Sequence, residues 1–160
     1  MSDREEAHLN NYETLKEFNL VSWSILEYGF NRGWVSKANI SDYATGLVAK
    51  TSEHLKDNFL IALDAEYREE SELNGALQEL KNLDLNCLDS ATSWRFVKLL
   101  ELRDSGLSEI VKIDKLQELY ATFDYPLDMR PCSIYSDDGM DPLAAMEDVI
   151  RRLERQILGL

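Results

Sequence analysis

The sequence has few of the residues on which several common protein classes depend. Its 160 residues include only two Cys, two His, three Pro and seven Gly. The two cysteines, Cys87 and Cys132, are too few and too far apart for a disulfide framework or for a zinc site made of closely paired thiolates. We therefore expect two reduced thiols. The low Gly and Pro content also excludes collagen-like and low-complexity chains.

Long apolar runs and basic residues are scarce as well. No apolar stretch approaches the roughly 20 residues that span a bilayer, and no basic region followed by an apolar one opens the chain. Thirty Asp and Glu against 17 Lys and Arg give a formal charge of -13, which opposes binding to nucleic acid phosphates and to anionic membrane surfaces. We expect a cytoplasmic protein that binds neither nucleic acid nor membranes and whose partner is basic.

The most regular feature of the sequence is helical periodicity. Apolar residues recur three and four positions apart in three stripes: Ile40, Tyr43, Ala44, Leu47 and Val48; Leu116, Leu119, Tyr120 and Phe123; and Leu143, Met146, Ile150, Leu153 and Ile157. Alternating strand patterns are rare, and residues 132–135 are the best candidate. The spacing predicts an all-α protein, with residues 1–160 forming a single-domain helical bundle or irregular array of about seven or eight helices.

Several residues are suited to the ends of these helices. Ser22 and Ser36 stand where N-cap side chains would accept hydrogen bonds from unpaired amides. Gly33 and Gly106 follow helical runs, where a left-handed residue favours glycine. Asp141 followed by Pro142 predicts a helix start, because proline loses nothing at the first helical position.

No catalytic motif is present. His8 and His54 lie in polar contexts away from any nucleophile motif, and no glycine-rich loop carries the lysine of a phosphate site. Paired carboxylates are expected by chance in a chain this acidic. We therefore assign no catalytic residue, cofactor or metal ligand and expect no enzyme. The alternatives are a Cys–His dyad formed across the fold and carboxylates that bind a metal in an arrangement hidden by sequence spacing.

Two acidic segments are the best candidates for recognition. One extends from Glu53 to Glu79 and contains only Lys56 and Arg68 as basic residues, and the other extends from Asp124 to Asp148. Such segments accelerate encounter with a cationic protein, although solubility alone is the simpler explanation. The candidate contacts are Asp124, Asp128, Asp137, Asp138 and Asp141, with Glu66, Glu69, Glu70 and Glu72 as a second patch.

Two stretches resemble a known bacterial family. Residues 18–35 read FNLVSWSILEYGFNRGWV, residues 40–44 read ISDYA, and residues 119–129 read LYATFDYPLDM. Together these stretches resemble the family called domain of unknown function 2247, which begins with a tryptophan helix, a glycine, a Gly-Trp step and a Tyr-Ala pair. The residues that match its pattern are Trp23, Gly29, Gly33, Trp34, Tyr43, Tyr125 and Pro126.

The resemblance implies a small helical bacterial protein. Some members occur beside polymorphic toxin genes, including contact-dependent growth inhibition systems, where the neighbour acts as an immunity protein. No catalytic residues are established for the family, so none is transferred. The hypothesis is an immunity protein that blocks the active site of a cognate toxin, expected to be a basic nuclease. The alternative is an acidic helical interaction module with an unrelated cellular partner.

Overall fold

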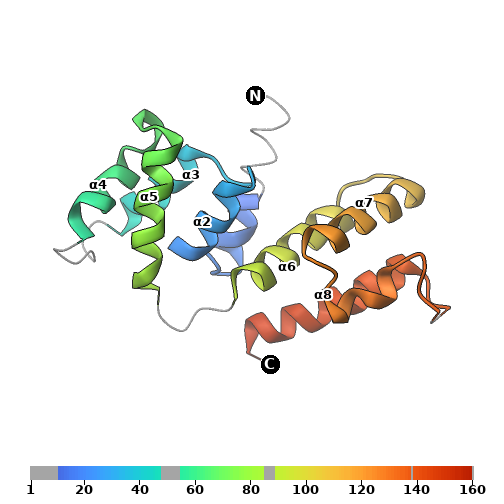
Figure 1. The fold of residues 1–160 in the computed structure, drawn as a ribbon. Coiled ribbons are helices and arrows are strands. Elements are labelled where there is room, and N and C mark those ends of the chain that lie inside the picture. The colour runs from blue at the N-terminus through green and yellow to red at the C-terminus, as the bar shows by residue number, and fades with distance from the viewer. Residues whose placement is uncertain (1–10, 48–54, 85–88, 138, 160) are drawn as a thin grey trace. The chain divides into compact units, whose positions relative to one another are not determined.

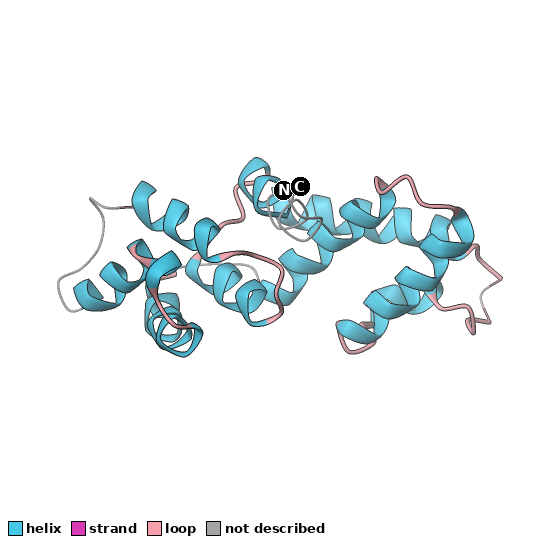
Figure 2. Ribbon diagram, turned by 90° about the horizontal axis from the view of Figure 1, so that it is seen from above, coloured by secondary structure: helices cyan, strands magenta, loops and turns pink. Residues whose placement is uncertain are grey.

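The chain forms an all-α protein, as the periodicity predicts. The computed structural model describes residues 11–47, 55–84, 89–137 and 139–159, and no strand occurs within these ranges (Figure 2). The chain divides into two compact units, residues 1–90 and 91–160 (Figure 1). Each unit is considered separately, and a single-domain organisation stays a prediction. None of the described helices is both long and apolar enough to cross a bilayer.

Unit 1 is a cluster of short helices. After the helical residues 11–17 it contains α2 (Trp23–Asn31), α3 (Lys37–Gly46), α4 (Lys56–Leu63), η3 (Ala65–Tyr67), α5 (Glu70–Leu80) and η4 (Lys81–Leu83), where η denotes a 3-10 helix. Helix α5 packs against both α2 and α4, and α3 packs against α4 and η3. The green helix α5 therefore lies between its neighbours in Figure 1.

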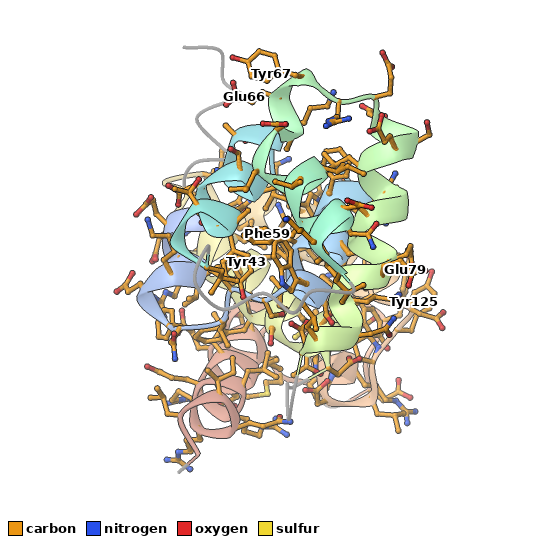
Figure 3. The ribbon with its side chains drawn as sticks, turned by 90° about the vertical axis from the view of Figure 1, so that its left-hand side faces the viewer. Tyr43, Phe59, Glu66, Tyr67, Glu79 and Tyr125 are labelled. Atoms are coloured by element: carbon orange, nitrogen blue, oxygen red, sulfur yellow. The ribbon has the colours of Figure 1, made fainter. Side chains whose placement is uncertain are left out.

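The core of unit 1 is centred on aromatic side chains. The buried Trp23 ring makes edge-to-face contacts with Tyr43, at 4.8 Å between ring centroids, and with Phe59, at 6.3 Å. Figure 3 shows Tyr43 and Phe59 among the packed side chains of this unit. Such pairs add specific geometry to the burial of apolar area. Trp23 is thus a packing residue rather than a binding residue.

The predicted helix ends of unit 1 are confirmed. The Ser22 hydroxyl accepts a hydrogen bond from the Ile25 amide at 3.1 Å, and Ser36 forms a reciprocal capping box with Asn39. Gly33 adopts a φ of 74°, which glycine tolerates because it has no Cβ.

A distant carboxylate completes the start of α2. The Asp84 carboxylate accepts hydrogen bonds from the backbone amides of Trp23, at 3.3 Å, and Ser24, at 2.7 Å. A negative charge at this position also interacts favourably with the helix dipole. The end of unit 1 is thereby joined to its second helix.

Unit 2 contains longer helices. Its elements are α6 (Ser90–Arg103), α7 (Glu109–Thr122), η5 (Leu127–Cys132) and α8 (Pro142–Leu158), and η5 packs against both α7 and α8. The predicted start of α8 is confirmed, because the Asp141 carboxylate accepts a hydrogen bond from the Ala144 amide at 3.0 Å and Pro142 takes the first helical position. Gly106 has a φ of 74°, as expected after a helix.

The strand suggested for residues 132–135 is wrong. Residue 132 ends η5, and the following residues form a turn. The Gln117 side chain on α7 donates a hydrogen bond to the Cys132 carbonyl at 2.9 Å and accepts one from the Ile134 amide at 3.2 Å. A side-chain amide therefore satisfies the backbone groups that a neighbouring strand would otherwise pair.

Candidate functional site

The two predicted acidic segments lie in different units. Unit 1 has 17 Asp and Glu against eight Lys and Arg, and unit 2 has 13 against nine. Both units are acidic, but unit 1 carries the larger excess of negative charge. The two segments are therefore separate candidate surfaces.

The segment of unit 1 runs from η3 into the first turn of α5. Glu72 forms an ion pair with Arg68 at 2.7 Å, and Asp64 approaches the same guanidinium at 3.6 Å. The other candidate carboxylates of this segment are exposed, and no described basic side chain lies within ion-pair distance of them; they are Glu66, Glu69 and Glu70. Glu70 and Glu72 also lie in the first turn of α5, where a negative charge stabilises the helix.

An aromatic side chain lies within this acidic segment. Tyr67 is 88% exposed, and Figure 3 shows it extending from the ribbon beside Glu66. A tyrosine offers large contact area together with a hydroxyl, which suits it to binding surfaces. The segment thus combines free carboxylates with one apolar contact residue.

In unit 2, two of the candidate aspartates have roles within the fold. Asp128 on η5 forms an ion pair with Arg95 on α6, and Arg95 is only 9% exposed. Asp141 caps α8. The need for a partner to Arg95 is visible in the sequence, because this arginine lies between Trp94 and Phe96 on a predicted helix and a buried guanidinium requires a counter-ion. Its identity depends on the fold and was not predicted.

The remaining aspartates of this segment are more accessible. Asp124 and Asp137 are exposed, and none of the basic side chains in the described ranges forms an ion pair with either. Asp138 lies outside the described residues. That any of the nine acidic candidates contacts a partner stays a prediction.

Large exposed side chains lie close to these aspartates in the sequence. Tyr125 and Leu127 are exposed, and Tyr135 is 87% exposed. Asp124 and Tyr125 adopt φ angles of 60° and 54°, in the left-handed region that non-glycine residues rarely enter. Their amides cap α7, because Asp124 donates to the Ala121 carbonyl and Tyr125 to the Tyr120 carbonyl. Helix termination therefore fixes the backbone at Tyr125 while its ring stays accessible.

The Cys132 thiol is unsuited to nucleophilic catalysis. Cys132 is fully buried, and burial, together with the nearby Asp128 carboxylate, raises the pKa of its thiol to about 11. The thiol is therefore protonated at neutral pH and does not act as a nucleophile. His8, His54 and Cys87 lie outside the described residues. No group of three or more potential metal ligands occurs in the described ranges.

A shallow cavity of about 380 Å³ in unit 1 contains polar groups that pair with one another. The Tyr12 hydroxyl donates to the Asp42 carboxylate at 2.8 Å, and the Lys16 ammonium lies 4.0 Å from the same carboxylate. Burial and the Asp42 carboxylate raise the pKa of Tyr12 above its ordinary value. Tyr12 therefore stays protonated and is unsuited to proton transfer near neutral pH.

These features define an acidic, all-helical protein with exposed carboxylate and aromatic surfaces. A family model described as an uncharacterized protein conserved in bacteria, DUF2247, matches residues 12–157. The chain belongs to this family, as the tryptophan helix and the Tyr125-Pro126 stretch suggest. No curated protein and no solved structure matches the chain.

Proposed function

We propose that this chain is an immunity protein that binds a cognate bacterial toxin in the cytoplasm and blocks its active site. The toxin is a basic protein, and a nuclease is the class that fits best, because its active site attracts phosphates. Carboxylates of the immunity protein take the positions of those phosphates. The chain itself performs no chemistry and needs no cofactor.

The observation that carries this proposal is the presence of exposed aromatic side chains beside carboxylates without described counter-ions. Tyr67 lies among Glu66, Glu69 and Glu70, and Tyr125 follows Asp124. Free carboxylates attract a cationic surface over a distance, whereas aromatic rings supply the apolar contact that keeps two proteins together. Solubility alone explains the carboxylates but not the neighbouring rings.

Coexpression with a toxin tests the proposal. The toxin domain encoded beside this chain is expressed in a bacterium with and without the chain, and growth is measured. We expect growth only when the chain is present, and a complex of the two proteins that survives gel filtration. Equal killing in both strains would refute the proposal for that pair. A chain whose gene has no neighbouring toxin gene would favour the alternative, an interaction module with another cellular partner.

A further inference from the structure

One side of α7 is mainly apolar and at least partly accessible to a partner. Ile110, Ile113, Gln117 and Tyr120 recur three and four residues apart, which places them along one side of the helix. Ile110 is 77% exposed, the other three members of the row are half-buried, and Leu116 is the only residue of α7 that is buried. The distance along the helix from Ile110 to Tyr120 is about 15 Å. A solvent-facing helix normally carries polar residues in such a row.

The segment after α7 extends this apolar row. The Tyr125 ring packs edge-to-face against Tyr120, at 5.0 Å between centroids, and the Ile134 amide donates to the Gln117 side chain at 3.2 Å. Because Gln117 and Tyr120 are neighbours on the helix surface, Tyr125 and Ile134 lie beside the same side of α7. The side chains of both residues are exposed. The apolar surface therefore continues beyond the helix.

Carboxylates border this surface. Asp114 lies four residues after Ile110, Glu118 lies one helical turn further on, and Asp124 precedes Tyr125. All three are exposed, and no described basic side chain forms an ion pair with them. An apolar centre with a charged border is the usual organisation of a protein interface. The charge of this border requires a partner with basic groups around its own apolar residues.

We propose that the α7 surface, formed by Ile110, Ile113, Gln117, Tyr120, Tyr125 and Ile134, is the docking surface for a cationic protein segment. That segment presents a row of aliphatic side chains bordered by Lys or Arg. The inference rests on the proposed function and assigns the main contact to unit 2. The apolar residues limit dissociation, and the bordering carboxylates accelerate association.

The test uses the full chain and a synthetic peptide of 18 residues. The peptide is an amphipathic helix with Leu on one face and Lys on the other, and its binding is measured by surface plasmon resonance at two salt concentrations. Two further peptides separate the contributions: one replaces every Lys by Glu, and the other replaces every Leu by Ser. We expect the Leu-Lys peptide to bind at least tenfold more tightly than either.

Variants of the chain locate the contact. Ile110→Ser combined with Ile134→Ser is expected to increase the dissociation rate about tenfold, because both side chains belong to the α7 surface. Asp114→Asn combined with Asp124→Asn is expected to slow association several-fold, mainly at low salt. Leu158→Ser is the matched control, because this side chain is 52% exposed, close to the 53% of Ile134, and lies near the end of α8 outside the α7 surface and both acidic segments. Circular dichroism checks that each variant is folded.

Several outcomes would overturn the inference. The first is equal binding of the Leu-Glu and Leu-Lys peptides, and the second is a Leu158→Ser effect as large as that of the isoleucine variants. A third is a dimer in light scattering that Ile110→Ser dissociates, since a second copy would then cover the α7 surface. Protection from a toxin that survives the isoleucine changes would reject this surface but keep the proposed function. Peptide binding at the α7 surface without protection from the toxin would keep this surface and reject the proposed function.

Discussion

Replacing Asp128 by Asn should destabilise unit 2. Asp128 is the ion-pair partner of Arg95, whose guanidinium is largely buried. The substitution keeps the shape of the side chain but leaves a buried positive charge without its counter-ion. Breaking a fully buried pair costs about 3–5 kcal/mol. Because Asp128 is partly exposed and Asn can still accept a hydrogen bond, we expect a loss of about 2 kcal/mol in the free energy of unfolding.

A neighbouring aspartate provides the control. Asp124→Asn removes the same charge from the same segment, but Asp124 is exposed and has no described ion-pair partner. Its left-handed backbone conformation also suits Asn. We expect this variant to change stability by less than about 0.5 kcal/mol. Urea denaturation followed by circular dichroism measures both variants.

Comparing Asp128→Asn with Asp124→Asn separates the loss of the ion pair from the general effect of removing one negative charge. Arg95→Met combined with Asp128→Leu removes both charges, so most of the stability should return because no unpaired buried charge remains. The reasoning would be refuted if Asp128→Asn and Asp124→Asn had equal unfolding free energies. It would also be refuted if the double variant were less stable than Asp128→Asn alone.

Three further predictions concern stability. Gly75→Ala should stabilise the chain by about 0.5–1 kcal/mol, because Gly75 lies inside α5 with open space around it. Gly106→Ala should instead destabilise the chain, because Gly106 has a φ of 74°. Urea midpoints that move in the same direction for both variants would contradict this prediction. Ser36→Ala removes the α3 capping box and should cost about 1 kcal/mol in urea denaturation, whereas Ser36→Asp should retain most of the stability. Between pH 9 and 11 the folded chain retains a proton on Cys132 that the unfolded chain loses, so stability falls as pH rises. Cys132→Ala should reduce this fall by up to about 3 kcal/mol, and parallel pH profiles for the two proteins would show that another group causes it.

The sequence was sufficient to predict the helices and several of their ends. Local rules determine these features: the periodic stripes give the helices, and Ser36, Gly33 and Asp141 act through their own backbone surroundings. The stripe of α7 was less informative, because only Leu116 of its apolar residues is buried. Apolar periodicity thus identified this helix, but it did not reveal how much of its apolar surface is exposed.

The candidate site could be predicted only in part. The sequence identified acidic segments, but it could not separate exposed carboxylates from those used within the fold. Asp128 and Asp124 look equivalent in the sequence, yet Asp128 is paired with Arg95, 33 residues away. Likewise, no local signal relates Gln117 to the backbone at Ile134. Such relations depend on tertiary contacts between residues distant in the chain.

The cap that Asp84 gives to α2 affects the order in which unit 1 can mature during synthesis. The chain leaves the ribosome from its N-terminus, so the residues of α2 emerge about 60 positions before this carboxylate. Until then the amides of Trp23 and Ser24 lack this partner, although the Ser22 hydroxyl can already accept from the Ile25 amide. A nascent chain that stops before residue 84 therefore has the residues of all the described helices of unit 1 but not the carboxylate that completes the start of α2. The final structure of this unit must await the residue that follows η4.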